Sequence, residues 1–523
     1  MSWFKLEKLK KIRVIVSLFF FIPISILFID PRNNIPSSVT NIFVSLQVIP
    51  SLTKIFVYSG TATIGLIIVV GLTIAFGRVY CSTLCPLGTF QDIIIHIKKK
   101  IDRKKRFEYI KSPFFFHYSL LAAIIIFTVG GSLTLLNLLE PFSNYGRILT
   151  NTIEPITTFI NNIIAGILGR YQYYYFYNIP LRDIGTSILI SAFVFLGLLV
   201  YMSYYHGRLF CNSLCPAGAL LGLISRFAFF KIIINKIACN DCGACEKVCK
   251  ANCIESETKR IDFSACVGCF NCIKSCPTDG IIYSAARIKI PVKDSSEFNP
   301  TRRKFFKEMA TPVIGLTLPG LANIDSAAVK SGYDANKKHP VTPPGSRSIQ
   351  HFSNLCTACH LCVSTCPTQV LYPSFLDYGL AGIFQPKMNY DASYCNYECT
   401  VCSQICPSGA ILPVDVEKKK LVQIGKSIFV KDDCVVVAKK KDCAACSEHC
   451  PTKAVYMVPY EGKLKIPEQN NDICIGCGAC EHACPTTPRK AIYVSPNRVH
   501  LQAQKPKVQK QEKGFDSKQD FPF

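Results

Sequence analysis

The sequence predicts an α-helical membrane bundle of four spans, with a candidate fifth, joined to small α+β domains that are rich in cysteine. Three observations support this architecture. Apolar residues are concentrated in the first 205 of the 523 residues, whereas the rest of the chain is more polar and rich in lysine. Of the 29 cysteines, 24 fall into six groups of four after residue 238. A segment that contains Cys-x3-Cys-Pro also occurs twice in the apolar part, at an offset of 130 residues.

Four apolar stretches are candidate membrane spans, because a helix crosses the hydrocarbon layer in about 20 residues. The first stretch is the shortest and contains Pro23. Cleaved signal peptides look similar, but the three further stretches behind it favour a retained helix. The stretches are Val14–Ile29, Phe56–Phe76, Phe114–Leu136 and Ile184–Tyr205.

Lysine and arginine are distributed unevenly around these stretches. They cluster at residues 5–13 and 98–106, before the first stretch and between the second and third, while the opposite loops contain few. Loops rich in Lys and Arg stay in the cytoplasm. The pattern therefore predicts a multi-pass protein of the bacterial inner (cytoplasmic) membrane, in which the N-terminus and the chain after Tyr205 are cytoplasmic.

Each group of four cysteines has the spacing of a ferredoxin iron–sulfur motif. Three closely spaced thiolates bind three corners of a [4Fe–4S] cluster, and the fourth, usually followed by proline, reaches the other cluster of a pair. Six [4Fe–4S] clusters are therefore expected, in α+β domains of the bacterial-ferredoxin type. The groups are Cys239–Cys249, Cys266–Cys276, Cys356–Cys366, Cys395–Cys406, Cys434–Cys450 and Cys474–Cys484.

Disulfides, zinc sites and nucleic-acid binding are less consistent with these cysteines and with the charge of the chain. Disulfide frameworks suit small secreted domains, and three close thiolates with a remote fourth suit a cluster better than zinc. The formal net charge of +24 falls by about half when each oxidised cluster contributes roughly −2. No other feature of the sequence supports nucleic-acid binding, so a nucleic-acid partner is not expected.

Cross-pairing of groups assigns the ligands of each cluster. In the two groups nearest the spans, Cys249 precedes Lys250 instead of proline; Cys253 could replace it, but the spacing favours Cys249. These two groups give Cys239, Cys242, Cys245 with Cys276, and Cys266, Cys269, Cys272 with Cys249. For the last four groups we expect nested pairing, which gives Cys356, Cys359, Cys362 with Cys484; Cys474, Cys477, Cys480 with Cys366; Cys395, Cys399, Cys402 with Cys450; and Cys434, Cys443, Cys446 with Cys406. Short strands are expected at Ala410–Val414 and Ala454–Val458.

The repeated segment runs from Gly77 to Gly88 and again from Gly207 to Gly218, and each copy follows a pair of spans. The two halves are therefore expected to be parallel repeats, with both segments at the cytoplasmic edge. Residues four apart share a helix face, so Cys81, Cys85, Cys211 and Cys215 could meet at one site. That site could hold a seventh metal centre, Fe–S or Cu(I), since soft thiolates select both. The thiols could also be redox-active dithiols or packing residues, and Arg78 and Arg208 are either helix-end anchors or catalytic.

Residues 301–307 read Thr-Arg-Arg-Lys-Phe-Phe-Lys and precede a mildly apolar run, Met309–Ala322. This pattern resembles a twin-arginine export signal placed inside the chain, and the run could remain as a fifth span or be cleaved. The predicted domains are a membrane domain (1–230), a cytoplasmic two-cluster domain (231–290), the twin-arginine segment with a Pro-rich linker (291–350), a periplasmic four-cluster domain (351–500) and a disordered tail (501–523).

The first 290 residues resemble the NapH-type membrane ferredoxins, relatives of NosR and CcoG, through the paired Gly-Arg-x-x-Cys-x3-Cys-Pro-x-Gly segments and the two-cluster domain. Residues 301–490 resemble the NapG-type exported four-cluster ferredoxins, so the chain looks like a fusion of the two. The resemblance implies a quinol dehydrogenase module, the quinol-oxidising component of an anaerobic respiratory chain. Its substrate would be menaquinol or ubiquinol, and its acceptor a periplasmic cytochrome or terminal reductase.

The sequence does not locate a quinol site, and catalytic residues stay unassigned. Ionisable or polar residues near the spans are functional candidates by default, although each singly suits a loop or interface; they are Gln47, Glu140, Glu154, His117 and His206. The alternative function is that of a CcoG-like copper reductase or oxidase-assembly factor that binds copper through the Cys-x3-Cys-Pro cysteines.

Overall fold

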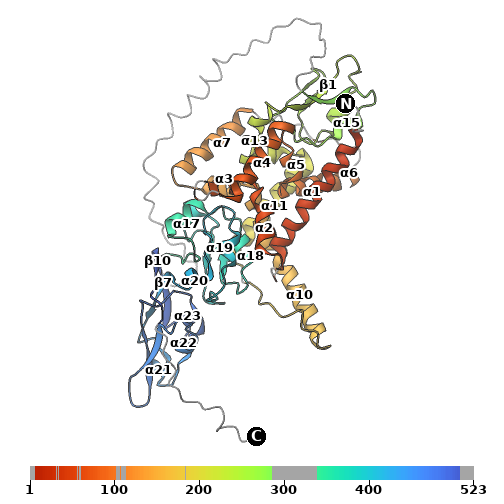
Figure 1. Cartoon of the computed structure of the whole chain (residues 1–523). Helices are drawn as coiled ribbons and strands as arrows, with labels where there is room; N and C mark the ends of the chain where they lie inside the picture. Colours follow the sequence, from red (N-terminus) through yellow and green to blue (C-terminus); the bar gives the residue numbers. More distant parts are fainter. Residues whose placement is uncertain are drawn as a thin grey trace, which may run out of the picture.

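The computed structural model describes residues 6–285 and 339–506, apart from residues 31, 33, 56, 58–59, 102–106, 108–113 and 183. The predicted twin-arginine segment, the apolar run and residues 507–523 lie outside these ranges. Within them, a helical domain stands between two cysteine-rich domains that lie at its opposite ends (Figure 1).

Two helices of the helical domain are long and apolar enough to cross a membrane, Lys8–Ile29 and Thr186–His206. Two further apolar helices, Ala62–Phe76 and Phe115–Val129, are shorter. All four coincide with predicted spans, but only two have the full length. The helices are α1 Leu6–Ile29, α2 Ser37–Ser45, α3 Val48–Ile55, α4 Thr61–Phe76, α5 Tyr80–Thr83, α6 Pro86–Ile101, α7 Phe114–Val129, α8 Thr134–Leu139, α9 Pro141–Ile148, η1 Leu149–Ile153, α10 Glu154–Gly169, α11 Thr186–His206, α12 Leu209–Ser213 and α13 Pro216–Ser225.

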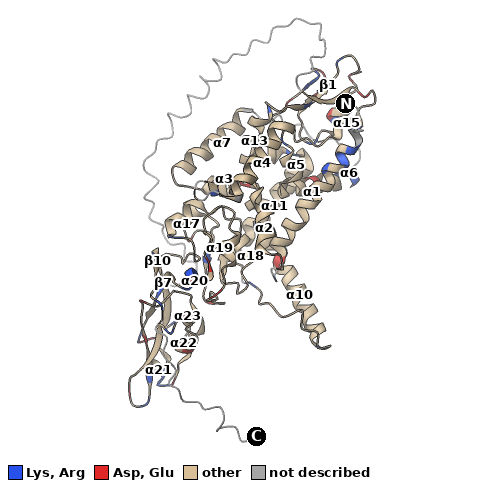
Figure 2. Cartoon of the chain, viewed as in Figure 1, with Lys and Arg blue, Asp and Glu red and all other residues tan. Residues whose placement is uncertain are grey.

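The outer faces of these helices are apolar. Ile15 on α1, Ile67 on α4 and Val194 on α11 are each about two-thirds exposed, at 67%, 65% and 65%. Large exposed apolar surfaces mark membrane or protein contacts, so the helical domain is suited to membrane association. The Lys-rich end of α6 lies near the two-cluster domain, as the blue segment in Figure 2 shows.

The two-cluster domain follows α13 and is built from two antiparallel strand pairs and two short helices. Its first strand continues directly from the helical domain, and Phe230 stacks on Phe76 with ring centroids 5.5 Å apart. Its elements are β1 Phe230–Ile234, α14 Ala244–Val248, β2 Ile254–Glu255, β3 Arg260–Ile261, α15 Asn271–Ser275 and β4 Ile281–Ala285, with β1 paired to β4 and β2 to β3.

The four-cluster domain is elongated, and a long ladder between β7 and β10 joins its two halves (Figure 1). Its described strands pair as β5 with β6, β7 with β10, and β8 with β9, all antiparallel. The elements are α17 Ile349–Leu355, α18 Leu361–Ser364, β5 Leu371–Pro373, η3 Leu380–Gly382, β6 Pro386–Met388, α19 Val401–Ile405, α20 Val416–Lys419, β7 Val422–Phe429, α21 Val435–Lys439, α22 Ala445–Glu448, β8 Val455–Pro459, β9 Lys465–Gln469, α23 Ala479–Ala483 and β10 Ile492–Gln502.

Three details of this domain differ from the sequence prediction. Residues 341–346, expected in a linker, are buried in the domain, and the Val341 carbonyl accepts a hydrogen bond from the Met388 amide at 3.0 Å. Ala410–Val414 forms no strand, because its amides bond elsewhere; that of Leu412 donates to the Gly345 carbonyl at 3.0 Å. The second expected strand is present as β8, and β10 extends into the residues assigned to the tail.

Candidate functional site

The two Cys-x3-Cys-Pro segments have the same local structure. Each begins after a long helix at a glycine with positive φ, Gly77 at 80° and Gly207 at 68°. Glycine adopts this backbone conformation readily, whereas residues with a Cβ atom disfavour it. A short helix, α5 or α12, carries the first cysteine of each segment. The proline then starts the next helix, since the first helical position tolerates its missing N–H.

The four cysteines of these segments come together in the centre of the helical domain. Their exposed fractions are 3–5%. Burial raises the pKa of Cys215, and the charges of Cys211, Cys81 and Cys85 raise it further. Thiols from both repeats therefore share one buried site, which the sequence left as one of several alternatives. Among the described residues, no three Cys, His, Asp or Glu side chains form a ready-made site for a single metal ion.

Arg78 and Arg208 cross between the two repeats. Nη2 of Arg78 donates to the Cys211 carbonyl at 3.0 Å and lies 3.9 Å from the Cys81 sulfur. Nη1 of Arg208 donates to the Cys81 carbonyl at 2.8 Å and lies 3.8 Å from the Cys211 sulfur. Both side chains are buried, at 1% and 0% exposure, so they are not anchors that reach a membrane surface.

The glycine that ends each segment makes room for this crossing. A Cβ atom at Gly88 would lie 2.2 Å from the Cys81 carbonyl oxygen and 2.8 Å from Nη1 of Arg208. Gly218 has the same relation to Cys211 and Arg78, at 2.2 and 2.8 Å. The whole Gly-Arg-x-x-Cys-x3-Cys-Pro-x-Gly pattern thus specifies a pair of thiols beside a crossed arginine.

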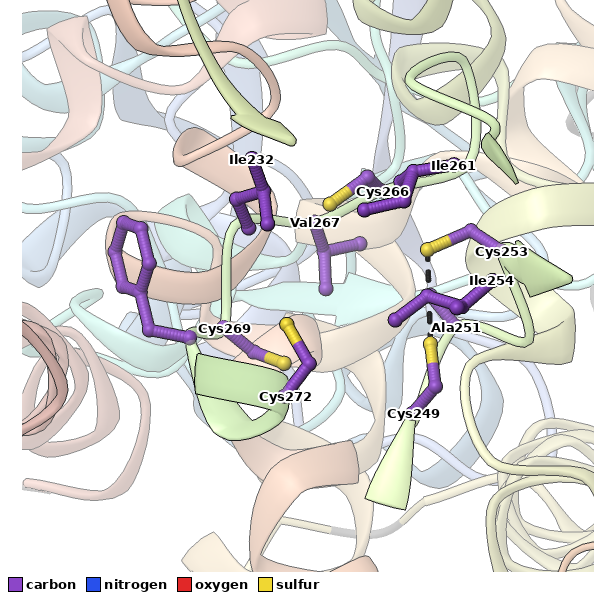
Figure 3. A pocket seen from close by; sticks show the side chains of 11 residues that line it. Ile232, Cys249, Ala251, Cys253, Ile254, Ile261, Cys266, Val267, Cys269 and Cys272 are labelled. Atoms are coloured by element: carbon purple, nitrogen blue, oxygen red, sulfur yellow. Dashed lines mark hydrogen bonds between the residues drawn. The ribbon is translucent and has the colours of Figure 1, made fainter. Parts of the chain in front are cut away.

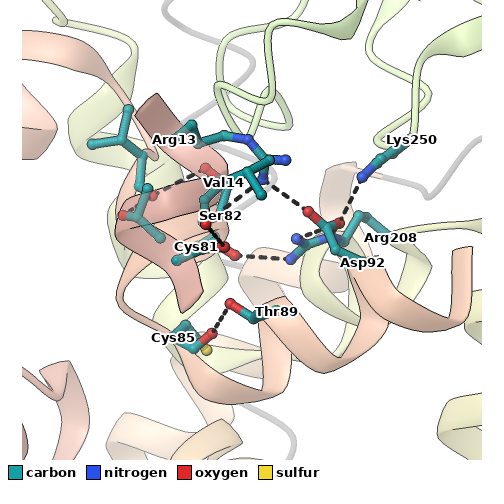
Figure 4. A network of polar contacts seen from close by, with 12 residues as sticks. Arg13, Val14, Cys81, Ser82, Cys85, Thr89, Asp92, Arg208 and Lys250 are labelled. Carbon is teal, nitrogen blue, oxygen red and sulfur yellow. Dashed lines mark hydrogen bonds and ion pairs between the residues drawn. The ribbon is translucent and has the colours of Figure 1, made fainter. Parts of the chain in front are cut away.

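A buried ionic network adjoins the four thiols (Figure 4). Asp92 on α6 binds Arg208 at 2.7 Å, Arg13 at 2.9 Å and Lys250 of the two-cluster domain at 3.2 Å. Burial opposes ionisation, but these three cations hold the pKa of Asp92 well below its usual range. One carboxylate faces three cations, so positive charge remains next to the thiols, where it favours thiolates or a negatively charged cluster.

Sequence reasoning did not single out Asp92. A signal was present, because an ionisable residue in an apolar run is a functional candidate. Asp92 lies between Phe90 and Ile95, in the apolar part of α6 that precedes its lysines.

In the two-cluster domain, the cysteines surround two small pockets. The first is lined by Cys239, Cys242, Cys245 and Cys276. The second is lined by Cys249, Cys253, Cys266, Cys269 and Cys272 (Figure 3). Both sets contain the predicted ligand quartets, and the second has one thiol too many. Four thiols around a mainly apolar cavity suit a [4Fe–4S] cluster, for which the protein supplies one thiolate per iron.

In the four-cluster domain the cysteines group in sequential pairs, and the nested pairing expected from the sequence differs from this arrangement. Burial raises the pKa values of one cysteine in each group, and the charges of nearby cysteines raise them further. These nearby cysteines show which fourth cysteine belongs to which group. The four reference residues are Cys362, Cys402, Cys446 and Cys480. The resulting sets are Cys356, Cys359, Cys362 with Cys406; Cys395, Cys399, Cys402 with Cys366; Cys434, Cys443, Cys446 with Cys484; and Cys474, Cys477, Cys480 with Cys450.

The first of these sets lies directly on the helical domain. Cys359 shares an apolar core with Phe28 of α1, and a Cβ at Gly146 of α9 would lie 2.3 Å from the Cys359 carbonyl oxygen. Next to it, Arg182 pairs with Glu154 at 3.3 Å and donates to the Val363 carbonyl at 2.9 Å.

Further contacts at this interface are hydrogen bonds between neutral groups. The Ser364 hydroxyl donates to the Leu27 carbonyl at 3.2 Å. His360 is buried between Asn151 (3.4 Å) and the Phe384 carbonyl (2.8 Å). The four-cluster domain is therefore fitted closely onto the end of the bundle.

The five candidate quinol-site residues are all buried but do not converge on one pocket. Gln47 accepts a hydrogen bond from the Tyr80 hydroxyl at 3.0 Å, and His117 contacts the Cys215 carbonyl at 3.1 Å. Glu140 caps α9 by accepting from the Phe142 amide at 3.0 Å and from the Ser143 amide. Glu154 pairs with Arg182, and His206 lies at the end of α11 against the Tyr201 ring.

Comparison with protein families identifies iron–sulfur domains along the chain. A 4Fe-4S binding domain matches residues 59–104 and 188–236, which contain the two Cys-x3-Cys-Pro segments. A 4Fe-4S dicluster domain matches residues 355–410 and 441–487. The first match covers two successive cysteine groups, and the second covers the next two apart from Cys434, as in the sequential pairing. A further 4Fe-4S binding domain matches residues 266–281. The prediction of several 4Fe–4S ferredoxin domains is therefore confirmed.

Curated relatives are ferredoxin-type electron transport proteins. The chain is 27% identical over 206 residues to the putative electron transport protein YccM of Escherichia coli, covering 39% of this chain and 50% of YccM. It is 25% identical over 212 residues to the methylamine utilization ferredoxin-type protein MauN of Methylobacillus flagellatus, covering 40% and 60%. It is 27% identical over 154 residues to the ferredoxin-type protein NapF of Escherichia coli, covering 29% and 85%. The chain thus spans about half the length of YccM.

Proposed function

We propose that this chain is a membrane-bound iron–sulfur electron-transfer protein that oxidises a quinol and relays the electrons through six [4Fe–4S] clusters to a periplasmic cytochrome or terminal reductase. The observation that supports it most is a single apolar core. That core contains Cys359 of the four-cluster domain, all four Cys-x3-Cys-Pro cysteines, and Cys249 and Cys272 of the two-cluster domain. Cluster ligands of both end domains are thus connected through packed protein.

The four buried thiols of the helical domain are the proposed middle of this relay. They lie between the two ferredoxin-type domains, beside Arg78 and Arg208, whose guanidinium groups stabilise negative charge there. A [4Fe–4S] cluster held by four thiolates carries about −2 when oxidised and suits this setting. Buried soft thiolates also suit Cu(I), which is the basis of the alternative function, a copper reductase of the CcoG type.

Glu140 is the proposed proton acceptor near the quinol. Oxidation of a quinol releases two protons and two electrons, and each cluster takes one electron. Burial raises the pKa of Glu140, although the Ser143 and Phe142 hydrogen bonds oppose the shift. A carboxyl group of raised pKa is suited to accept a proton. The charge of Glu140 also acts on Tyr80 and on Cys359, which places it between the thiol site and the first cluster of the four-cluster domain.

The test is anaerobic addition of menaquinol or ubiquinol to the full chain in vesicles, with cluster absorbance followed near 400 nm. The proposal expects bleaching with at least one quinol, and slower bleaching in Glu140→Gln. If neither menaquinol nor ubiquinol bleached the clusters, the proposal would be contradicted. Metal analysis of the same sample separates the alternative, because a copper reductase would contain copper and would reduce Cu(II) whether or not the quinol bleaches the clusters.

A further inference from the structure

In five of the six cysteine groups, a hydroxyl group lies next to the sulfur of the fourth cysteine. This cysteine is followed by proline and then by threonine or serine, and the hydroxyl lies within hydrogen-bonding reach of the sulfur two residues back. The pairs are Cys276–Thr278 at 3.6 Å, Cys366–Thr368 at 3.7 Å, Cys406–Ser408 at 3.7 Å, Cys450–Thr452 at 3.7 Å and Cys484–Thr486 at 3.1 Å. Because a cluster ligand is a thiolate, the hydroxyl is the donor in each pair.

The remaining group lacks this hydroxyl. Cys249 is followed by Lys250 and Ala251, so neither the proline nor the threonine is present. The sulfur of Cys253 instead lies 3.6 Å from that of Cys249, a separation like those of the hydroxyls in the other groups. A thiol thus lies where the other groups have a hydroxyl.

The local backbone explains why Cys253 reaches this position. Asn252 has a positive φ of 50°, which turns the chain so that Cys249 and Cys253 face the same cavity (Figure 3). Cys253 is 6% exposed and lines the same pocket as Cys266, another residue of the same ligand set. Its thiol therefore lies among the ligands of one cluster site.

The missing Pro-Thr pair is explained by the contact with the helical domain. Lys250 binds Asp92 at 3.2 Å through its amine, and its carbonyl accepts from the Arg208 amide at 2.8 Å. The Ala251 carbonyl accepts from the Asn212 side chain at 3.0 Å. Position 250 is therefore occupied by a lysine that takes part in the ionic network. The donor that faces Cys249 is residue 253, two positions later than the hydroxyl residue of the other groups.

We infer that Cys253 is a positioning residue that donates its S–H to the cluster ligand Cys249, in place of the hydroxyl found in the other groups. The fourth ligand remains Cys249, whose spacing matches the other groups. Hydrogen bonds to the ligand sulfurs are among the factors that set cluster potentials, because the donor stabilises the more negative reduced state. The inference requires a [4Fe–4S] cluster at this site but is independent of quinol oxidation.

The test compares the full-length variants Cys253→Ala, Cys253→Ser and Cys249→Ala by iron content and by EPR-monitored titration with dithionite. We expect Cys253→Ala to keep the iron content of the wild type while one component of the titration shifts to lower potential. Cys253→Ser, which keeps a donor, should lie nearer the wild type. Cys249→Ala should lose iron from this cluster. Thr278→Ala is the matched control, because it removes the hydroxyl at the neighbouring cluster and should lower the potential of a different component.

Two results would overturn the inference. Loss of iron in Cys253→Ala, with iron retained in Cys249→Ala, would make Cys253 the ligand. An unchanged titration in Cys253→Ala would show that its thiol has no electronic role. Because dithionite supplies the electrons, neither result depends on whether the chain oxidises quinol.

Discussion

The two cysteine-rich domains contact the helical domain through different chemistry. At the two-cluster end, Asp92 is surrounded by Arg13, Arg208 and Lys250, and its carboxylate is held ionised. At the four-cluster end, the contact combines apolar packing with hydrogen bonds between neutral groups. Its buried ion pair, Glu154 with Arg182, has a carboxyl whose pKa burial raises despite the arginine.

This difference indicates separate roles for the two ends. The ionised Asp92 network fixes Arg208 and the loop after Cys249 in one arrangement next to the four buried thiols. At the other end, burial raises the pKa of the Glu154 carboxyl, so the charged form of its pair with Arg182 is less strongly favoured.

Replacement of Asp92 by asparagine should have the largest effect, because it leaves three buried cations without their anion. Breaking a buried ion pair by removal of one partner typically costs about 3–5 kcal/mol. We expect a lower unfolding temperature and loss of cluster iron from the two-cluster domain. The matched variant at the other end, Glu154→Gln, should cost less, since burial already favours the neutral carboxyl there. If Asp92→Asn and Glu154→Gln lowered the unfolding temperature equally, the contrast between the two ends would be contradicted.

Gly88→Ala should destabilise the protein next most, because the added Cβ would overlap the Cys81 carbonyl and the Arg208 guanidinium. Overpacking in a core costs about 1–3 kcal/mol. The control is Gly71→Ala on α4, where an added Cβ has no neighbour within 4 Å. Thermal unfolding of the purified proteins should separate the two, and a Gly88→Ala protein as stable as the control would disprove the crossed-arginine packing.

Acidification should affect the two ends differently. The pKa of Glu154 is raised on folding, so its contribution to stability is greatest below its unfolded value, 4.5, and declines as pH rises through the folded pKa. The pKa of Asp92 is lowered, so its contribution is complete above its unfolded value, 3.8, and is lost only as pH falls through the folded pKa. As the pH falls toward 4.5, limited proteolysis should therefore show a tighter four-cluster contact and an unchanged two-cluster contact. If acidification loosened the two-cluster contact toward protease and left the four-cluster contact unchanged, this expectation would be contradicted.

Ser364→Ala should have the smallest effect, because it removes one hydrogen bond between neutral groups, to the Leu27 carbonyl. Such a bond contributes about 0.5–1.5 kcal/mol. The four-cluster domain should be cleaved from the helical domain by protease slightly faster, while the unfolding of the two-cluster domain stays unchanged. A loss as large as that of Asp92→Asn would mean that the four-cluster end depends on specific polar contacts.

The cysteine spacing was sufficient to predict the 4Fe–4S domains, because a cluster requires thiolates at short fixed intervals. From it we expected nested pairing of the last four groups, whereas the structure brings them together in sequential pairs. All four end in Cys-Pro followed by Thr or Ser, so the local sequence does not distinguish their partners. Which fourth cysteine reaches which cluster depends on how the β7–β10 ladder folds the two halves together, and that is a long-range property.

The helical domain was predicted less completely, because the contacts between its two repeats also depend on long-range packing. The repeat itself indicated that Cys81, Cys85, Cys211 and Cys215 could meet, and the structure brings them together. The crossing of Arg78 and Arg208 was not visible, since an arginine at a helix end more often reaches the surface. What distinguishes these two is the glycine ten residues later, whose role emerges only when the repeats are packed against each other.

Electron passage between the two ends of the bundle through the buried thiols can be measured with the full chain in sealed vesicles. Dithionite, which does not cross the membrane, is added to one side only. We expect the clusters of both cysteine-rich domains to bleach, and we expect Cys85→Ala combined with Cys215→Ala to confine bleaching to the exposed domain. Bleaching limited to one domain in the wild-type protein would contradict it.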